Sequence, residues 1–344
     1  MTKRRFTPEE LLASHAYAAP QREGGFLLHG GFDAKDRYIP PRSLHRARAI
    51  EAWTEHLHER GSQPLQTDAS LLNGIRYPNA SQMKFLLLSG LGQTFWNTLT
   101  ITGHIEARGR LLAEIAFPEF QDHVEQDVSE MAVGHLNRGL LLAHGLDEGG
   151  EPDKGIGGHD VMWFALRDLA FGPTDFPEPE VPENIARPET AQREVPEVSV
   201  AIEQTISMLL NLLLIEFRAE LGFQLAEDLL RDPELFPERR DGAEQAAVLV
   251  GRIREDEAIH VSSLKLILGE IRTLDFHTPK GKPLSGSSIV DPLWEKIVTW
   301  ATVDQPREIA KRQRQMLTER ILAHPDGEAL LVRFEALGEQ GSPA

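Results

Sequence analysis

Four long helical patterns, arranged as two pairs with one long connection between them, are the feature that most constrains the fold. Apolar residues recur every three to four positions over about 81–116, 120–144, 199–231 and 243–274, which is typical of amphipathic helices. The segment 172–198 separates the pairs and contains six prolines, which favours an extended connection over a regular element. Helix pairs joined by one long crossover are typical of four-helix bundles. We therefore expect an all-α four-helix bundle.

The remaining sequence is divided around this bundle. Residues 1–80 are rich in glycine and proline and contain one helical pattern near 43–60, so we expect a loop-rich N-terminal extension. The bundle itself is expected at 81–275 with its crossover at 145–198, and shorter helices are expected in a C-terminal extension at 276–344. The glycine-rich break that opens the crossover is equally compatible with a domain boundary.

Composition narrows the classes of function. The formal net charge of −17 argues against a nucleic-acid partner, since proteins that bind phosphate backbones carry basic surfaces. The chain contains no cysteine, which excludes disulfides and leaves imidazole and carboxylate as the metal ligands, a set that suits iron, manganese or zinc. The N-terminus has no apolar signal core, and the apolar run Met208–Ile215 is too short to span a bilayer. We therefore expect a cytoplasmic protein with no membrane partner.

Polar residues interrupt the apolar stripes of the second helix pair. The stripe of the last pattern consists of Ala246, Val250, Ile253, Glu257, His260, Leu264, Ile267 and Ile271. Glu257 and His260 are its only polar members. The stripe of the preceding pattern contains Glu216 and, one turn further along, Glu220. Glu216 and Glu257 are each about twenty residues from the midpoint of the connecting loop, so a rise of about 1.5 Å per residue places them at one level of the bundle.

The first helix pair offers fewer polar residues on its inward faces. Glu106 is the lone acid in the first stripe, and His135 is the lone polar member of the second, at a comparable distance from the turn between them. The position three residues before His135 is Ala132. Glu130 lies about 140° from His135 on a regular helix. A π-bulge between these two residues would turn Glu130 inward, and such bulges are frequent at functional sites.

Buried acids on these faces require a compensating charge. An uncompensated buried carboxylate costs several kcal/mol and tends to take up a proton instead. A di- or trivalent cation would supply the opposite charge. Arginines are the alternative, and Arg110 and Arg218 are close in sequence to the inward acids.

This arrangement resembles the ferritin-like di-iron carboxylate superfamily. The residues that carry the resemblance are Glu257-Ala258-Ile259-His260, Glu216 or Glu220, Glu106 and His135. The resemblance covers about 81–274, over half of the chain. Sites of that superfamily take one glutamate from each of two helices and a Glu-x-x-His motif from each of the other two. This sequence departs from the pattern at Ala132, where the second motif requires a glutamate.

The resemblance implies a metal centre bound by side chains from all four helices. The candidate ligands are Glu106, Glu130, His135, Glu216, Glu220, Glu257 and His260. Two iron ions, or manganese and iron, are the metals that the resemblance implies. Because of Ala132, a single metal ion, an altered dinuclear centre and an empty site are the alternatives.

Two other histidine-containing segments are interpreted without a metal. A second Glu-x-x-His occurs at Glu55–His58, but both residues fall on the charged side of their helical pattern, which indicates a solvated face. His159 follows the glycines of Gly155–Gly158, and we interpret it as a helix entry rather than a ligand.

Two hypotheses of function from different classes follow. The first is a non-haem di-iron (or manganese–iron) oxidase or oxygenase that uses dioxygen on a small organic substrate. The alternative is a non-catalytic helical binding or scaffold protein whose ferritin-like metal site has decayed. A mononuclear metal hydrolase or a metal store is a third possibility, and storage is disfavoured by the large segments outside the bundle. A homodimer is the commonest oligomer for such a chain.

Overall fold

Helices make up most of this protein. The computed structural model describes residues 3–67, 71, 77–188 and 192–339. Within these residues strands form only short two-stranded antiparallel ribbons, so the expected all-α class is confirmed. The α-helices are α1 (Pro8–Leu11), α2 (Ser43–Glu59), α3 (Ala80–Leu88), α4 (Gln93–Gly109), α5 (Leu141–Gly149), α6 (His159–Phe171), α7 (Val200–Arg231), α8 (Arg240–Ile271), α9 (Gly286–Thr299), α10 (Gln305–Leu322) and α11 (Gly327–Glu339). The ribbons pair β1 (Gln21–Glu23) with β2 (Phe26–Leu28), β3 (Gly31–Phe32) with β4 (Tyr38–Ile39), and β5 (Asp275–Phe276) with β6 (Leu284–Ser285).

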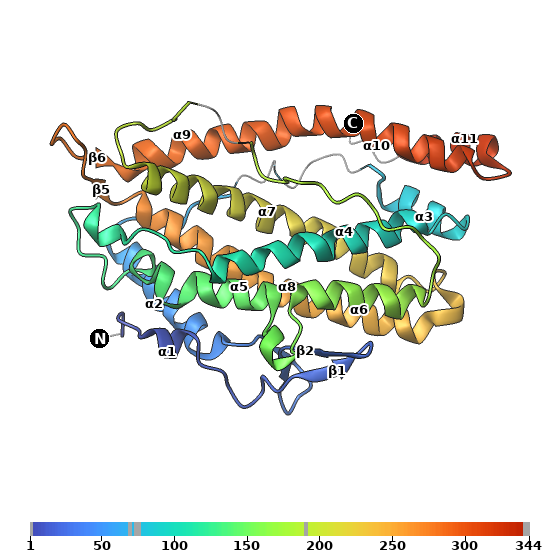
Figure 1. Cartoon of the computed structure of the whole chain (residues 1–344), viewed down its shortest axis with the longest axis horizontal. Helices are drawn as coiled ribbons and strands as arrows, with labels where there is room; N and C mark the ends of the chain where they lie inside the picture. Colours follow the sequence, from blue (N-terminus) through green and yellow to red (C-terminus); the bar gives the residue numbers. More distant parts are fainter. Residues whose placement is uncertain (1–2, 68–70, 72–76, 189–191, 340–344) are drawn as a thin grey trace.

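Four helical rods form the centre of the molecule. They are α4, the pair α5 and α6, α7, and α8, and Figure 1 shows α5 and α6 lying end to end. Helix α8 packs against both α6 and α7, while α4 packs against α5 and α6. Helix α2 packs against α8, and α9 packs against α7. The rods therefore bring side chains from α4, α5, α6, α7 and α8 into one interior.

Helix α7 contains a long apolar stretch. It begins after Ser199, whose side chain accepts a hydrogen bond from the Ile202 amide as an N-cap. By length and composition α7 is apolar enough to cross a membrane, and half of its most apolar window is buried inside the protein. Core helices have the same composition, because a helix that is apolar on most sides is covered on most sides.

The second rod differs from the expected one. The pattern at 120–144 does not form a continuous helix: 3-10 turns occupy Phe120–Asp122 and Ala132–His135, and a π-helical turn occupies Leu136–Leu140. Residue Gly139 has a φ of 144° inside that turn, which only glycine adopts readily. The rod is built by α5, which begins at the end of that pattern, and by α6, which lies inside the segment expected to be the crossover. The actual connection to α7 is shorter and follows Phe171.

The first expected helix is also divided. The pattern at 81–116 forms α3 and α4, separated at Gly90, which has a φ of 77°. A 3-10 turn, η2 (Arg110–Ala113), then ends the rod. Close packing favours glycine nearby, because a Cβ atom on Gly145 of α5 would lie 2.5 Å from the Ala113 amide nitrogen. Gly145, which belongs to the glycine-rich break of the sequence, therefore allows close helix packing here and does not form a loop.

The buried apolar residues form two clusters along the rods. One contains Leu213 of α7 and Leu264 of α8, together with residues of α2 and α9. The other contains Phe223 of α7 and Ile253 of α8, together with residues of α4 and α6. Between these residues, α7 buries Glu216 and α8 buries Asp256, Glu257 and His260. A polar layer therefore lies between the two apolar cores.

Candidate metal centre

Helices α7 and α8 supply the part of this polar layer that the sequence predicted. Glu257 and His260 lie one turn apart on α8, and His260 Nδ1 is 3.0 Å from Glu257 Oε2. Glu216 of α7 lies beside Glu257 and shares a hydrogen bond with it. All three side chains are buried. Helical periodicity thus placed these residues at one level and facing inward, as expected.

Helices α5 and α6 supply a second acid–histidine pair, Glu148 and His159. The chain leaves the rod after Gly149 and returns at Gly158, where a Cβ atom would lie 2.5 Å from the Glu148 carbonyl oxygen. Gly158 therefore sits directly on the end of α5. Along the rod the order is Glu148, Gly149, Gly158, His159, which reproduces in space a Glu-x-x-His motif that is interrupted in the sequence. His159 Nδ1 lies 3.4 Å from Glu148 Oε1.

Helix α4 adds Glu106 from the remaining rod. Its Oε2 atom is 3.7 Å from His159 Nδ1, and its side chain is largely buried. Near it, Gly109 allows α4 to approach α5, because a Cβ atom there would lie 2.4 Å from Glu148 Cγ. Each of the four rods therefore contributes at least one acid, and two of them contribute a histidine as well.

The side chains form two adjoining groups. Within each group, ligand atoms all lie within 4.8 Å of one another. The first group, which we name position A, consists of Glu106, Glu148, His159 and Glu257. The second, position B, consists of His144, Glu148, Glu216 and His260. Two donors that bind one metal at about 2.1 Å and at a right angle are about 3 Å apart, so these spacings are close to those of a coordination sphere.

Two glutamates connect the positions. Glu148 Oε1 lies 3.4 Å from His159 Nδ1 and 3.3 Å from His260 Nδ1. Glu257 directs Oε1 towards His159 at 3.1 Å and Oε2 towards His260 at 3.0 Å. Glu148 therefore faces both positions through one oxygen, and Glu257 faces each position with a different oxygen.

Several atoms that point into the cluster have no hydrogen-bond partner. Among the described residues these are Glu148 Oε1, Glu257 Oε1 and His159 Nδ1, all of which are buried. A buried polar atom without a partner costs about 1–3 kcal/mol, and native proteins leave few of them. A cation at each position would bind these atoms directly. The residues present therefore fit a metal pair.

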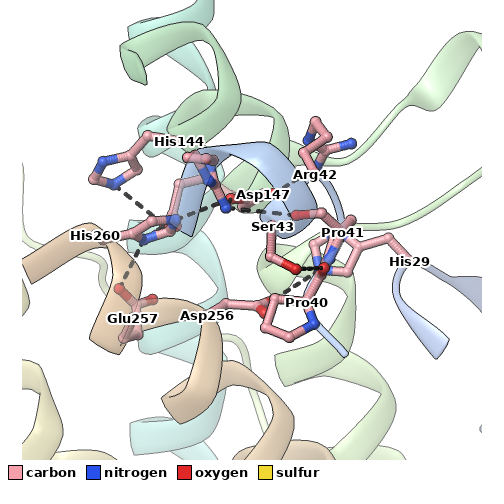
Figure 2. A network of polar contacts seen from close by, with 12 residues as sticks. His29, Pro40, Pro41, Arg42, Ser43, His144, Asp147, Asp256, Glu257 and His260 are labelled. Atoms are coloured by element: carbon pink, nitrogen blue, oxygen red, sulfur yellow. Dashed lines mark hydrogen bonds and ion pairs between the residues drawn. The ribbon is translucent and has the colours of Figure 1, made fainter. Parts of the chain in front are cut away.

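The opposite side of each histidine ring is bound by an aspartate. Asp147 Oδ2 lies 3.1 Å from His260 Nε2, and Asp256 Oδ2 lies 3.0 Å from His159 Nε2. Each aspartate directly precedes the glutamate of the other histidine's motif. Figure 2 shows His260 between Glu257 and Asp147. Such contacts hold the ring so that Nδ1 points at the cluster, which is how outer hydrogen bonds orient metal-binding histidines.

Residues of the N-terminal segment support these aspartates. Arg42 and Arg46 donate to the two oxygens of Asp147 at 2.5 and 2.6 Å. The Tyr38 hydroxyl donates to Asp256 at 3.0 Å, and His29 Nε2 lies 3.2 Å from the same oxygen. The N-terminal segment thus covers one side of the polar layer.

Burial and mutual charge set the pKa values of the glutamates. Burial raises the pKa of Glu106 well above its usual range, and the charge of Glu148 raises it further. Burial, the charge of Glu257 and their hydrogen bond raise the pKa of Glu216 to about 8. Burial alone would raise the pKa of Glu148 too, but the facing His159 holds it well below its usual value. Two of the four glutamates therefore have raised pKa values in the metal-free protein.

Burial and facing charges act on the pKa values of the two histidines with signs opposite to those for Glu148. Burial alone would lower the pKa of His159, but the charge of Glu148 raises it well above its usual value. His260 behaves in the same way, with Glu257 as the main opposing charge. The acids around these rings therefore favour the cationic imidazole, and a metal ion at either position would compete with the proton on Nδ1.

The remaining predicted ligands lie elsewhere. His135 Nδ1 bonds the Met131 carbonyl at 2.8 Å, and its ring packs on Trp53. The side chain of Glu130 is half exposed, 3.6 Å from Arg5. The structure places neither side chain at the cluster, and 132–135 forms a 3-10 turn whose first amides are bound by Glu270. Glu220 forms an ion pair with Arg254 and does not join the cluster, which corrects that alternative in favour of Glu216.

Sequence reasoning missed Glu148 and His159, and it interpreted His159 as a helix entry. His159 does begin α6, but its side chain also points into the cluster. One local signal was available: Asp147-Glu148 repeats the Asp-Glu pair of Asp256-Glu257. His144 was also missed, although it lies one turn before Glu148 on α5.

Comparison with known proteins gives no family for this chain: no family model, no curated protein and no solved structure matches it. The functional interpretation therefore depends on the geometry of the cluster.

Proposed function

We propose that this protein is a ferritin-like di-metal carboxylate oxidase or oxygenase that acts on a small organic substrate with dioxygen. The observation that carries the proposal is the set of Glu106, Glu148, His159, Glu216, Glu257 and His260. It contains one glutamate from each of two rods and a Glu-x-x-His arrangement from each of the other two, as ferritin-like dinuclear sites do. The expected resemblance had one gap, at Ala132, and Glu148 fills that role from α5.

Charge balance supports two cations rather than one. Glu106, Glu148, Glu216 and Glu257 carry four negative charges when ionised, and two divalent cations neutralise them. The two further buried aspartates, Asp147 and Asp256, are matched in number by Arg42 and Arg46, both of which pair with Asp147. The absence of cysteine ligands and the mixture of carboxylate and imidazole suit iron or manganese. A pair of these metals would supply redox chemistry with dioxygen and Lewis acidity.

The protein's own residues have defined tasks in such a site. Glu148 and Glu257 hold the two positions together, while Glu106 and Glu216 each serve one position. Asp147 and Asp256 orient the histidines through Nε2. The apolar clusters on either side of the layer exclude water from it. The decayed-scaffold alternative rested on a missing glutamate, and that reason is removed by Glu148.

Metal content tests this proposal. Protein produced with iron or manganese in the medium is expected to contain about two metal ions per chain, as measured by elemental analysis. Glu257→Ala combined with His260→Ala removes the carboxylate that faces both positions and an imidazole, so it is expected to lose both ions. The matched control is His135→Gln, which alters a buried histidine outside the cluster and should keep both. Wild-type protein that stays metal-free after exposure to both metals would refute the proposal. If the metals bind, dioxygen uptake by the loaded protein in the presence of a reductant tests the oxidase activity.

A further inference from the structure

Position B contains a second imidazole that position A lacks. His144 lies on α5 one turn before Glu148, and its Nε2 atom is 3.0 Å from Glu216 Oε1 and 3.6 Å from Glu148 Oε1. Its ring stacks on His260 with centroids 3.7 Å apart and planes 14° apart, so one of the two rings must turn before both can direct a nitrogen lone pair at a single ion. The side chain is buried, and Figure 2 shows it beside His260.

No corresponding residue serves position A among the described residues. The buried histidine nearest to His159 is His29, with ring centroids 5.5 Å apart. His29 directs Nε2 to Asp256, which binds the Nε2 side of His159 and not the Nδ1 side that faces the cluster. Position A therefore offers one imidazole among carboxylates, and position B offers two.

We infer that His144 is a seventh metal ligand, which makes position B rich in nitrogen and position A rich in oxygen, so that the two positions select different metals. The inference rests on the proposed dinuclear centre and deepens it. Affinity for divalent metals rises from manganese through iron to cobalt, and imidazole suits the later metals while carboxylate suits manganese. Position B then binds iron or cobalt in preference to manganese, and position A accepts manganese.

A purely structural role for His144 makes a different prediction. In that case His144 only hydrogen-bonds Glu216, and any side chain that keeps this bond preserves the site. His144→Gln retains a polar group of similar reach that can donate to Glu216, while it removes the imidazole. His144→Ala removes both. The glutamine variant therefore distinguishes a ligand from a positioning residue.

The test uses Co(II) and Mn(II) on metal-free full-length protein. One equivalent of Co(II) followed by one of Mn(II) is expected to place cobalt at position B and manganese at position A, as seen by anomalous diffraction at the two absorption edges. Affinity for the first Co(II), measured by its visible absorption, is expected to fall at least about tenfold in both His144 variants, as loss of a metal-site contact does. His135→Gln is the matched control and should bind as wild type does.

The outcomes separate the two proposals. Cobalt at position A, or cobalt spread evenly over both positions in wild-type protein, would overturn the inference and leave the dinuclear centre intact. So would His144→Gln with wild-type affinity for Co(II). Wild-type protein that binds neither ion would overturn the inference together with the proposed function. Cobalt at position B, with weakened binding in both variants, would establish His144 as a ligand.

Discussion

Asp147 and Asp256 each hold the Nε2 side of a histidine whose Nδ1 side faces the cluster. At the scale of single residues this arrangement fixes which nitrogen is available to a metal. The same acids, together with Glu148 and Glu257, draw protons onto His159 and His260 in the metal-free protein. Metal and proton therefore compete for the same atoms.

This competition predicts proton release on metal binding. The pKa values of Glu106, Glu216, His159 and His260 are all raised, that of Glu216 to about 8, so up to four protons leave when two ions bind near neutral pH. Because deprotonated ligands bind metal, apparent affinity is expected to rise from about pH 6 to about pH 8. Calorimetry in buffers of different ionisation enthalpy counts the protons. Binding that releases no proton and has the same affinity over this range would contradict the prediction.

The second rod is interrupted between α5 and α6 by an excursion, residues 150–157. This excursion closes on itself through hydrogen bonds between Glu151 and Ile156. It then pairs with β2, where the Gly157 amide donates to the Leu27 carbonyl at 2.8 Å. The His29 amide bonds the Gly157 carbonyl at 3.0 Å in return. The excursion thus ties the bundle to the N-terminal segment, while the rod continues past it.

Removal of the excursion tests whether the rod is continuous in register. Deletion of residues 150–157 joins Gly149 to Gly158 and creates Glu148-Gly149-Gly158-His159 as one helical motif. We expect this variant to bind two metal ions by elemental analysis, although it loses the contacts with β2. Deletion of residues 150–156 leaves one extra residue and turns His159 by about 100° away from the cluster. Equal metal loss in both deletions, with both variants folded by circular dichroism, would argue against the interrupted motif.

At the scale of the whole molecule, the N-terminal segment and the bundle form one structure. Arg42 and Arg46 contact Asp147 deep inside the bundle, and Arg252 of α8 contacts Glu23 and the His29 carbonyl in return. The segment therefore supplies charges that the polar layer needs. A fully buried aspartate destabilises the folded protein unless such charged partners remain.

Loss of one of these partners is expected to destabilise the metal-free protein. Arg46→Met keeps an apolar stem of similar length, but leaves Asp147 with one guanidinium instead of two. We expect the free energy of unfolding in urea to fall by about 2 kcal/mol, because the buried Asp147 Oδ2 atom loses a charged donor while Arg42 stays in place. Arg37→Met is the matched control, because Arg37 pairs with Asp33 on the surface of the same segment and should change stability little. Equal effects of the two substitutions would show that Arg42 alone balances Asp147.

The extent of prediction differed between the helix pairs for a physical reason. Helical periodicity and rise are local properties, so the sequence alone placed Glu257 and His260 on one face, Glu216 at their level and Glu106 on an inward face. The same reasoning misplaced His135, because local periodicity predicts that a side chain is buried without showing what surrounds it. His135 is indeed buried, but against Trp53.

By itself, therefore, the sequence determined the helical class, the absence of thiolate ligands and the residues that α4, α7 and α8 contribute to the site. Only the tertiary structure decided what α5 and α6 contribute. Glu148 and His159 are eleven positions apart in the chain, and they become neighbours because Gly158 returns onto the end of α5 while the intervening loop pairs with β2. That return depends on contacts between residues distant in sequence, which no periodicity within one helix contains.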